Sequence, residues 1–258
     1  MRIVVLVKEV PDTYGDRHLD LETGLTQREG GENVLDEITE RALEAALKHA
    51  EAGDGVEITL LSMAPDAAEA SVRKGLALGA ASATIVSDEA LAGADAVLTA
   101  QVLAAALRRQ GFDLVLAGAS STDGTGGVIP SLLAELLGVP GAVGLSSLEI
   151  SADAVGGARP VDGGVQQVRA ALPAVASVTE ALPDARFANF KGIVAAKKKP
   201  IERLSLAELD IAVDPAVEAR SILVSVAQRP PRAGGVKIVD EGDAGTQLAA
   251  FLAENRLV

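Results

Sequence analysis

Hydrophobic residues along the first 140 positions fall into two alternating patterns. Four short runs are largely apolar, at positions 3–7, 57–62, 83–86 and 113–117. Runs of this length predict strands that are buried on both faces, as in a parallel sheet. The first, Ile-Val-Val-Leu-Val, is the clearest because it is continuous and rich in β-branched residues.

Longer segments with helical spacing separate these runs. Residues 36–51 place Ile38, Ala42 and Ala46 on one face, which predicts an amphipathic helix. Three further helices are predicted at 65–78, 95–109 and 126–137, each closed by a glycine. The alternation of strands and helices, with short connections, predicts a doubly wound, mostly parallel α/β sheet of the Rossmann-like type.

After residue 140 the pattern changes. Strands are predicted at 145–152, 165–171 and 174–178, partly antiparallel, and 182–204 is predicted to be a loop with a basic run. The end of the chain is rich in proline and glycine and is expected to be extended until a helix at 243–254. We therefore predict an α/β nucleotide-binding domain, 1–209, and an arm, 210–258, that packs on a partner.

Composition narrows the classes of function. The net charge is −13 and aromatic residues make up 2% of the chain, so a basic, base-stacking surface for nucleic acid is not expected. Cysteine is absent, and two histidines, His18 and His49, are too few for a His-rich metal site. With no recognisable signal peptide and no apolar run of about 18 residues, we expect a cytoplasmic protein without membrane insertion.

Two loops are expected to meet at the carboxyl edge of the sheet, where open parallel sheets bind ligands. One begins at Lys8, and the other has the sequence Gly-Ala-Ser-Ser-Thr-Asp-Gly-Thr-Gly-Gly at 118–127. Hydroxyls, glycines and free N–H groups before a helix favour phosphate binding. A plain turn capped by its Ser, Thr and Asp is an equally open interpretation, because the loop is neither a Walker A motif nor G-x-G-x-x-G.

The remaining polar positions have two interpretations each. Asp36 opens the first helix three residues after Asn33, either as a simple N-cap or beside the same nucleotide. Phe187 and Phe190 precede the basic run 197–199, which is typical of a solvated patch or of a protein-docking element. Since no catalytic set is recognisable, the residues alone predict a nucleotide-binding α/β protein with an arm and not a stand-alone enzyme.

Several segments carry a family resemblance when they are taken in order. They include Val-Val-Leu-Val-Lys-Glu-Val-Pro-Asp-Thr at 4–13, Asn-Val-Leu-Asp-Glu at 33–37, Asp-Gly-Gly-Val-Gln-Gln-Val at 162–168 and Lys-Lys-Lys-Pro-Ile-Glu at 197–202. Further matching segments are 42–46, 77–80, 172–175 and 230–237, and the lysine run belongs to a longer matching segment, 186–202. The ordered set resembles the electron transfer flavoprotein (ETF) beta subunit family over nearly the whole chain, although Val34 stands where that family often has proline.

The resemblance implies an adenine nucleotide hydrolase-like fold and an electron carrier subunit, paired as a heterodimer with a larger alpha subunit that carries FAD. It implies primary dehydrogenases, such as acyl-CoA dehydrogenases, as electron donors and an ETF-quinone oxidoreductase as the route to the respiratory chain. This chain is expected to bind a structural AMP. The implied nucleotide-binding residues are Leu6, Asn33, Val34, Leu35, Asp36, Met63, Ala119, Ser120, Ser121, Thr122, Asp123, Gly124, Thr125, Gly126 and Gly127.

The resemblance also implies a flavin contact and a docking loop. Thr13 is expected near the flavin of the partner subunit, and Phe190 occupies the position of the apolar anchor for dehydrogenases. The implied recognition residues are Phe187, Phe190, Lys191, Ile193, Lys197, Lys198 and Lys199. Two alternatives stay open: a bifurcating form whose nucleotide site holds a second FAD that reacts with NADH, and a universal-stress-like nucleotide-binding protein.

Overall fold

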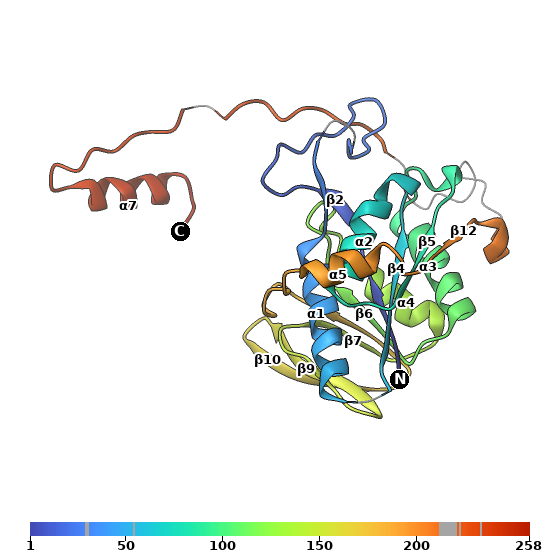
Figure 1. Ribbon diagram of the computed structural model, residues 1–258. Coiled ribbons are helices and arrows are strands. Elements are labelled where there is room, and N and C mark those ends of the chain that lie inside the picture. The colour runs from blue at the N-terminus through green and yellow to red at the C-terminus, as the bar shows by residue number, and fades with distance from the viewer. Residues whose placement is uncertain (29–30, 54, 212–220, 222, 233) are drawn as a thin grey trace. The chain divides into compact units, whose positions relative to one another are not determined.

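The computed structural model describes residues 1–28, 31–53, 55–211, 221, 223–232 and 234–258. The chain forms two compact units, Met1–Val224 and Ser225–Val258, and Figure 1 shows the order of their elements. The division at residue 209 stays a prediction, and residues 212–220 of the predicted arm lie outside the described residues.

A seven-stranded sheet forms the centre of the first unit. Its strands run in the order β12-β5-β4-β1-β6-β11-β7, and all neighbouring pairs are parallel. Strands β4 and β5 are added on one side of β1 and β6 on the other, so the strand order reverses between β1 and β6. This confirms the predicted doubly wound, mostly parallel α/β fold. The strands are β1 (Arg2–Leu6), β4 (Glu57–Met63), β5 (Ser82–Val86), β6 (Leu114–Gly118), β7 (Gly141–Leu145), β11 (Ala174–Val178) and β12 (Ile201–Leu204).

Helices cover both faces of this sheet (Figure 1). Successive side chains of a strand point to opposite faces, and Ile3 and Val5 pack with α1 and α2, whereas Val4 and Leu6 pack with α3 and α4. The core is built mostly from Ala, Val, Leu and Ile, as the scarcity of aromatic residues requires. The helices are α1 (Glu37–Ala52), α2 (Glu69–Leu78), α3 (Ala96–Gln110), α4 (Ile129–Leu137) and α5 (Phe190–Ala196), with short 3-10 turns at Asp66–Ala68, Glu89–Leu91 and Ala207–Leu209.

Two predicted boundaries were wrong. Helix α4 begins at Ile129 instead of residue 126, because Gly127 has a φ of 65° that a right-handed helix does not accept. The predicted strand 145–152 overlaps β7 only at Leu145 and otherwise contains only the short β8 (Glu149–Ile150). In the turn between them, the Ser146 N–H donates to the Ala158 carbonyl at 2.8 Å.

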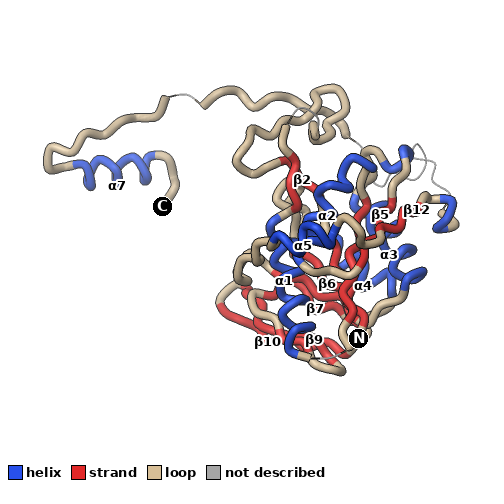
Figure 2. The backbone as a smooth tube through the Cα atoms, in the orientation of Figure 1, coloured by secondary structure: helices blue, strands red, loops and turns tan. Residues whose placement is uncertain are grey.

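A three-stranded antiparallel sheet, in the order β10-β9-β8, confirms that part of the region after residue 140 is antiparallel. Strands β9 (Ala154–Val161) and β10 (Gly164–Ala171) lie side by side in Figure 2. The sequence did not predict β9 because Gly156, Gly157 and Pro160 are weak strand formers.

The predicted loop at 182–204 was also wrong, because it contains helix α5 and strand β12. Both elements are short and depend on contacts with α2 and β5 rather than on a periodic pattern of their own. A two-stranded ladder of β2 (Glu9–Pro11) and β3 (Asn33–Leu35) was missed for the same reason.

The second unit contains helix α7 (Ala244–Glu254), close to the predicted bounds. No residue in its described part is buried, so its described residues form no core of their own. Within the part of the chain that the structure describes, no helix has both the length and the apolar character needed to span a membrane.

Candidate functional site

The carboxyl ends of β1 and β6 define the candidate site, since parallel sheets bind ligands where the strand order reverses. Strand β1 leads into Lys8 and β2, and β6 leads into the loop 119–127 before α4. In Figure 2, β2 lies at the end of the sheet opposite the N-terminus. Leu6 and Met63 are the last residues of β1 and β4, so the structure brings these predicted residues to the same edge.

Asp36 links the first helix to the nucleotide loop. Its carboxylate is fully buried, and Oδ1 accepts a hydrogen bond from the Ile38 N–H at 2.9 Å, which caps α1. Its Oδ2 accepts from the N–H and the hydroxyl of Thr122 at 2.7 and 2.9 Å. The structure therefore shows Asp36 as the N-cap of α1 and in contact with the loop, whereas its place beside a nucleotide stays a prediction.

The loop 119–127 keeps an unusual backbone. Thr125 has a φ of 50°, a region that β-branched residues rarely adopt, and its N–H donates to the Ser121 carbonyl at 2.9 Å. Gly126 and Gly127 are exposed, and their N–H groups donate to no other group in the described chain. These N–H groups precede α4, whose positive end favours an anion.

Asn33 adds a buried hydrogen-bond acceptor near the same edge. Its Nδ2 donates to the Arg28 carbonyl at 3.0 Å, whereas its buried Oδ1 has no donor among the described residues. Leaving such an atom unsatisfied costs about 1–3 kcal/mol. Val34 and Leu35 pair with Val10 and Glu9 across the β2–β3 ladder. An unsatisfied acceptor suits a hydroxyl or amino donor, and loop amides that have no acceptor among the described residues suit a phosphate.

Three basic residues that were not among the predicted site residues reach this loop: Lys8, Arg28, and Arg17, whose Nη1 donates to the Thr122 carbonyl. Lys8 Nζ lies 2.7 Å from Asp123 Oδ1 and 3.2 Å from the Ser121 hydroxyl, and Arg28 Nη2 lies 2.9 Å from Asp123 Oδ2. Burial alone would raise the pKa of Asp123, but Lys8, Ser121 and Arg28 hold that pKa well below its usual range. Lys8 could have been found from its position directly after the first strand, whereas nothing in the polar stretch around Arg28 marked it.

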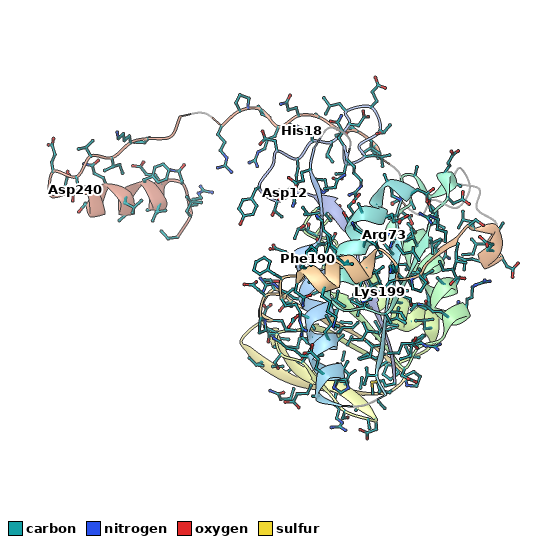
Figure 3. The ribbon with its side chains drawn as sticks, in the orientation of Figure 1. Asp12, His18, Arg73, Phe190, Lys199 and Asp240 are labelled. Atoms are coloured by element: carbon teal, nitrogen blue, oxygen red, sulfur yellow. The ribbon has the colours of Figure 1, made fainter. Side chains whose placement is uncertain are left out.

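The predicted recognition segment forms a separate surface on α5. Phe187 and Phe190 are 98% and 81% exposed, and Figure 3 shows Phe190 at α5, with Arg73 and Lys199 near the same helix. Asn189 caps α5 by accepting from the Gly192 N–H at 2.8 Å. A side chain at Gly192 would collide with the Ala77 carbonyl of α2, so glycine allows the two helices to touch.

The lysines of this segment differ in their surroundings. Lys191, Lys197 and Lys198 are exposed, as is Ile193. Lys199, by contrast, donates from Nζ to the carbonyls of Leu76 and Ala80 at 2.8 and 2.6 Å, at the end of α2. Burial lowers the pKa of Lys199. Lys199 therefore fastens the segment to the domain through its side chain.

The predicted flavin contact, Thr13, lies on the surface. Thr13 is exposed in the loop that follows β2.

The segment before α5 is held by Arg186, which forms ion pairs with Glu44 and Glu51 of α1. Among the described residues, no group of three or more His, Asp or Glu side chains is arranged to hold a metal ion. Helix α5 of the recognition segment packs on α2, whereas the nucleotide loop lies between β6 and α4. The two therefore belong to different elements.

Comparison with known proteins shows which family the chain resembles. Residues 23–209 match the family model of the electron transfer flavoprotein domain. The chain is 42% identical over 264 residues to electron transfer flavoprotein subunit beta of Mycobacterium leprae, and the match covers 99% of both chains. It is 40% identical over 263 residues to the protein of the same name from Mycobacterium tuberculosis, again over 99% of both. The corresponding protein of Bacillus subtilis is 33% identical over 212 residues, which cover 82% of this chain and 81% of the relative.

Proposed function

Because the chain belongs to the electron transfer flavoprotein family as a beta subunit, we propose that it is the small subunit of a cytoplasmic, heterodimeric electron carrier. The observation that carries this proposal is the similarity to subunit beta relatives over 99% of the chain. FAD, bound mainly by the alpha subunit, supplies the electron-accepting chemistry. The residues of this chain support the complex by binding a nucleotide, docking dehydrogenases and contacting the alpha subunit through the arm.

The nucleotide that this chain binds is AMP, in a structural role. The N–H groups of Gly126 and Gly127, which have no acceptor among the described residues, suit a phosphate. Asn33 Oδ1, which has no donor among the same residues, suits a hydroxyl or amino donor of the nucleoside. Asp36 keeps the loop in place through Thr122. The predicted contacts of Leu6, Val34, Leu35, Met63 and the rest of 119–127 belong to this proposal.

Dehydrogenases dock on the exposed segment 187–198. Phe190 is the apolar anchor, with Phe187 and Ile193 beside it in sequence and exposed Lys191, Lys197 and Lys198 as a basic rim. Primary dehydrogenases such as acyl-CoA dehydrogenases supply the electrons, and an ETF-quinone oxidoreductase receives them. Thr13 approaches the flavin of the partner subunit.

The test is co-expression of the chain with its alpha subunit, followed by reduction of the purified complex. We expect a stable heterodimer whose FAD is reduced by an acyl-CoA substrate plus its dehydrogenase. A stable monomer, or a heterodimer whose flavin stays oxidised with every primary dehydrogenase supplied, would contradict the proposal. Family membership decides against the universal-stress-like alternative.

A bifurcating subunit remains the second candidate within the family, because the same edge geometry suits the phosphates of a dinucleotide. In that case NADH alone would reduce the complex, and a second FAD would replace AMP. The carrier proposal predicts no reduction by NADH in the absence of a dehydrogenase.

A further inference from the structure

A shared carboxylate brings two cations to the nucleotide loop. Lys8 comes from the end of β1 and Arg28 from the segment between β2 and β3, and they bind opposite oxygens of Asp123 at 2.7 and 2.9 Å. Arg28 is held a second time because its Nη1 donates to the Glu9 carbonyl at 3.1 Å. Two separate segments therefore converge on one point of the loop.

The cations lie on the solvent side of the carboxylate. The side chain of Asp123 is only 3% exposed, whereas those of Lys8 and Arg28 are 41% and 33% exposed. A lysine ammonium has three N–H donors and an arginine guanidinium has five, and the described contacts use only some of them. Both groups can therefore donate to a ligand without leaving Asp123.

Gly124 lies next to the Lys8 ammonium. A Cβ at this position would lie 4.0 Å from Lys8 Nζ and 3.5 Å from the Ser121 hydroxyl. The ammonium thus lies beside Gly124, in the same loop as Gly126 and Gly127, whose N–H groups donate to no acceptor among the described residues. An anion bound by those amides would lie in the loop that the ammonium contacts through Ser121 and Asp123.

We propose that Lys8 and Arg28 bind the phosphate of the nucleotide and that Asp123 is the residue that positions both. This inference rests on the proposed binding of AMP by this chain. Charge-assisted hydrogen bonds from Lys and Arg are among the stronger contacts a phosphate can receive. Asp123 is buried beneath the Lys8 and Arg28 side chains, so its role is to fix their positions. The phosphate contacts these two side chains and the loop amides.

The test compares AMP with adenosine, which lacks the phosphate. The complex with the alpha subunit is stripped of nucleotide by dialysis at high salt, and binding of each compound is measured by calorimetry. We expect Lys8→Met and Arg28→Gln each to weaken AMP binding about tenfold or more and to leave adenosine binding within about twofold. Arg169→Gln is the matched control, because Arg169 is an exposed arginine that pairs with Asp153 on the antiparallel sheet; it is expected to bind AMP as the unchanged complex does.

A third variant tests the positioning role of Asp123. Asp123→Asn removes a negative charge. If only charge mattered, AMP binding would become stronger; if Asp123 positions Lys8 and Arg28, AMP binding becomes weaker. Stronger AMP binding by this variant, unchanged AMP binding by both cation variants, or an equal loss for AMP and adenosine would overturn the inference. If the unchanged complex binds AMP in that event, the proposed function survives; if it binds neither compound, both proposals fail.

Discussion

The carboxylate of Asp36 accepts hydrogen bonds from both the N–H and the hydroxyl of Thr122, at 2.7 and 2.9 Å. The same carboxylate caps α1 through the Ile38 N–H. One buried side chain thus joins the first helix to a loop 86 residues away in the sequence. The position of the nucleotide loop therefore depends on α1 as well as on strand β6.

Removing the Asp36 carboxylate is expected to destabilise both the start of α1 and the loop 119–127. Asp36→Ala leaves the start of α1 uncapped and two donors of Thr122 unpaired, which costs about 2–4 kcal/mol in the free energy of unfolding. Urea unfolding measures the loss, and the bound nucleotide per complex is expected to fall with it. Asp88→Ala is the control, because Asp88 also accepts from two N–H groups, those of Ala90 and Leu206; it is expected to lower stability and keep the nucleotide.

Asp123 is expected to make stability depend on pH in the acid range. Burial opposes ionisation of Asp123, but Lys8, Ser121 and Arg28 lower its pKa overall. An aspartate with a lowered folded-state pKa stabilises the protein fully above its unfolded value of about 3.9, and this contribution is lost as the pH falls towards the folded value. Asp123→Asn is therefore expected to be about 1–3 kcal/mol less stable at pH 7, with a gap that narrows below about pH 4. Urea unfolding at pH 7, 5 and 3 measures the gap, and a constant difference would contradict this assignment.

Phe190 is expected to serve docking and not stability. Its side chain is 81% exposed, so Phe190→Ala changes the free energy of unfolding by no more than about 0.5 kcal/mol. Loss of an aromatic anchor is expected to slow reduction by a limiting dehydrogenase about tenfold, with no change in nucleotide content. Val165→Ala, at a 63% exposed position on β10, is the control. Unchanged dehydrogenase turnover in Phe190→Ala would count against the docking proposal.

The lysine run is expected to divide into two functions. Lys199→Met removes the ammonium that binds the Leu76 and Ala80 carbonyls, so it is expected to lower the free energy of unfolding by about 1–2 kcal/mol. Lys198 is exposed, so Lys198→Met is expected to leave the free energy of unfolding unchanged. Dehydrogenase reduction by the Lys198 variant is expected to lose part of its dependence on salt, since exposed charges act mainly on association. Equal stability of the two variants would show that Lys199 is not a structural residue.

The sequence predicted the elements whose patterns are local. Strands β1, β4, β5 and β6 and their helices follow from apolar runs and helical spacing, and glycines marked the ends of α2 and α4. Helix α5 could not be predicted in this way, because it has seven residues and, besides its Asn189 cap, depends on packing against α2, where Gly192 allows close contact with Ala77. Strand β9 was hidden by its own glycines.

In the candidate site, too, local features were predictable and contacts between distant segments were not. The loop 119–127 was predicted from its residue types and its place after a strand. The Asp36–Thr122 and Arg28–Asp123 contacts were not predictable, since they join segments 86 and 95 residues apart. The two functions of the lysine run were equally hidden, because Lys198 and Lys199 differ only in what lies beneath them.

The nucleotide held by this chain tests the account most directly. The complex of the chain with its alpha subunit is denatured, and the released nucleotides are separated and quantified by chromatography and mass spectrometry. The account predicts one AMP and one FAD for each heterodimer. Two FAD molecules and no AMP would contradict it in favour of the bifurcating form, and one FAD with no second nucleotide would contradict the assignment of a nucleotide site to the edge at Asp36 and Thr122.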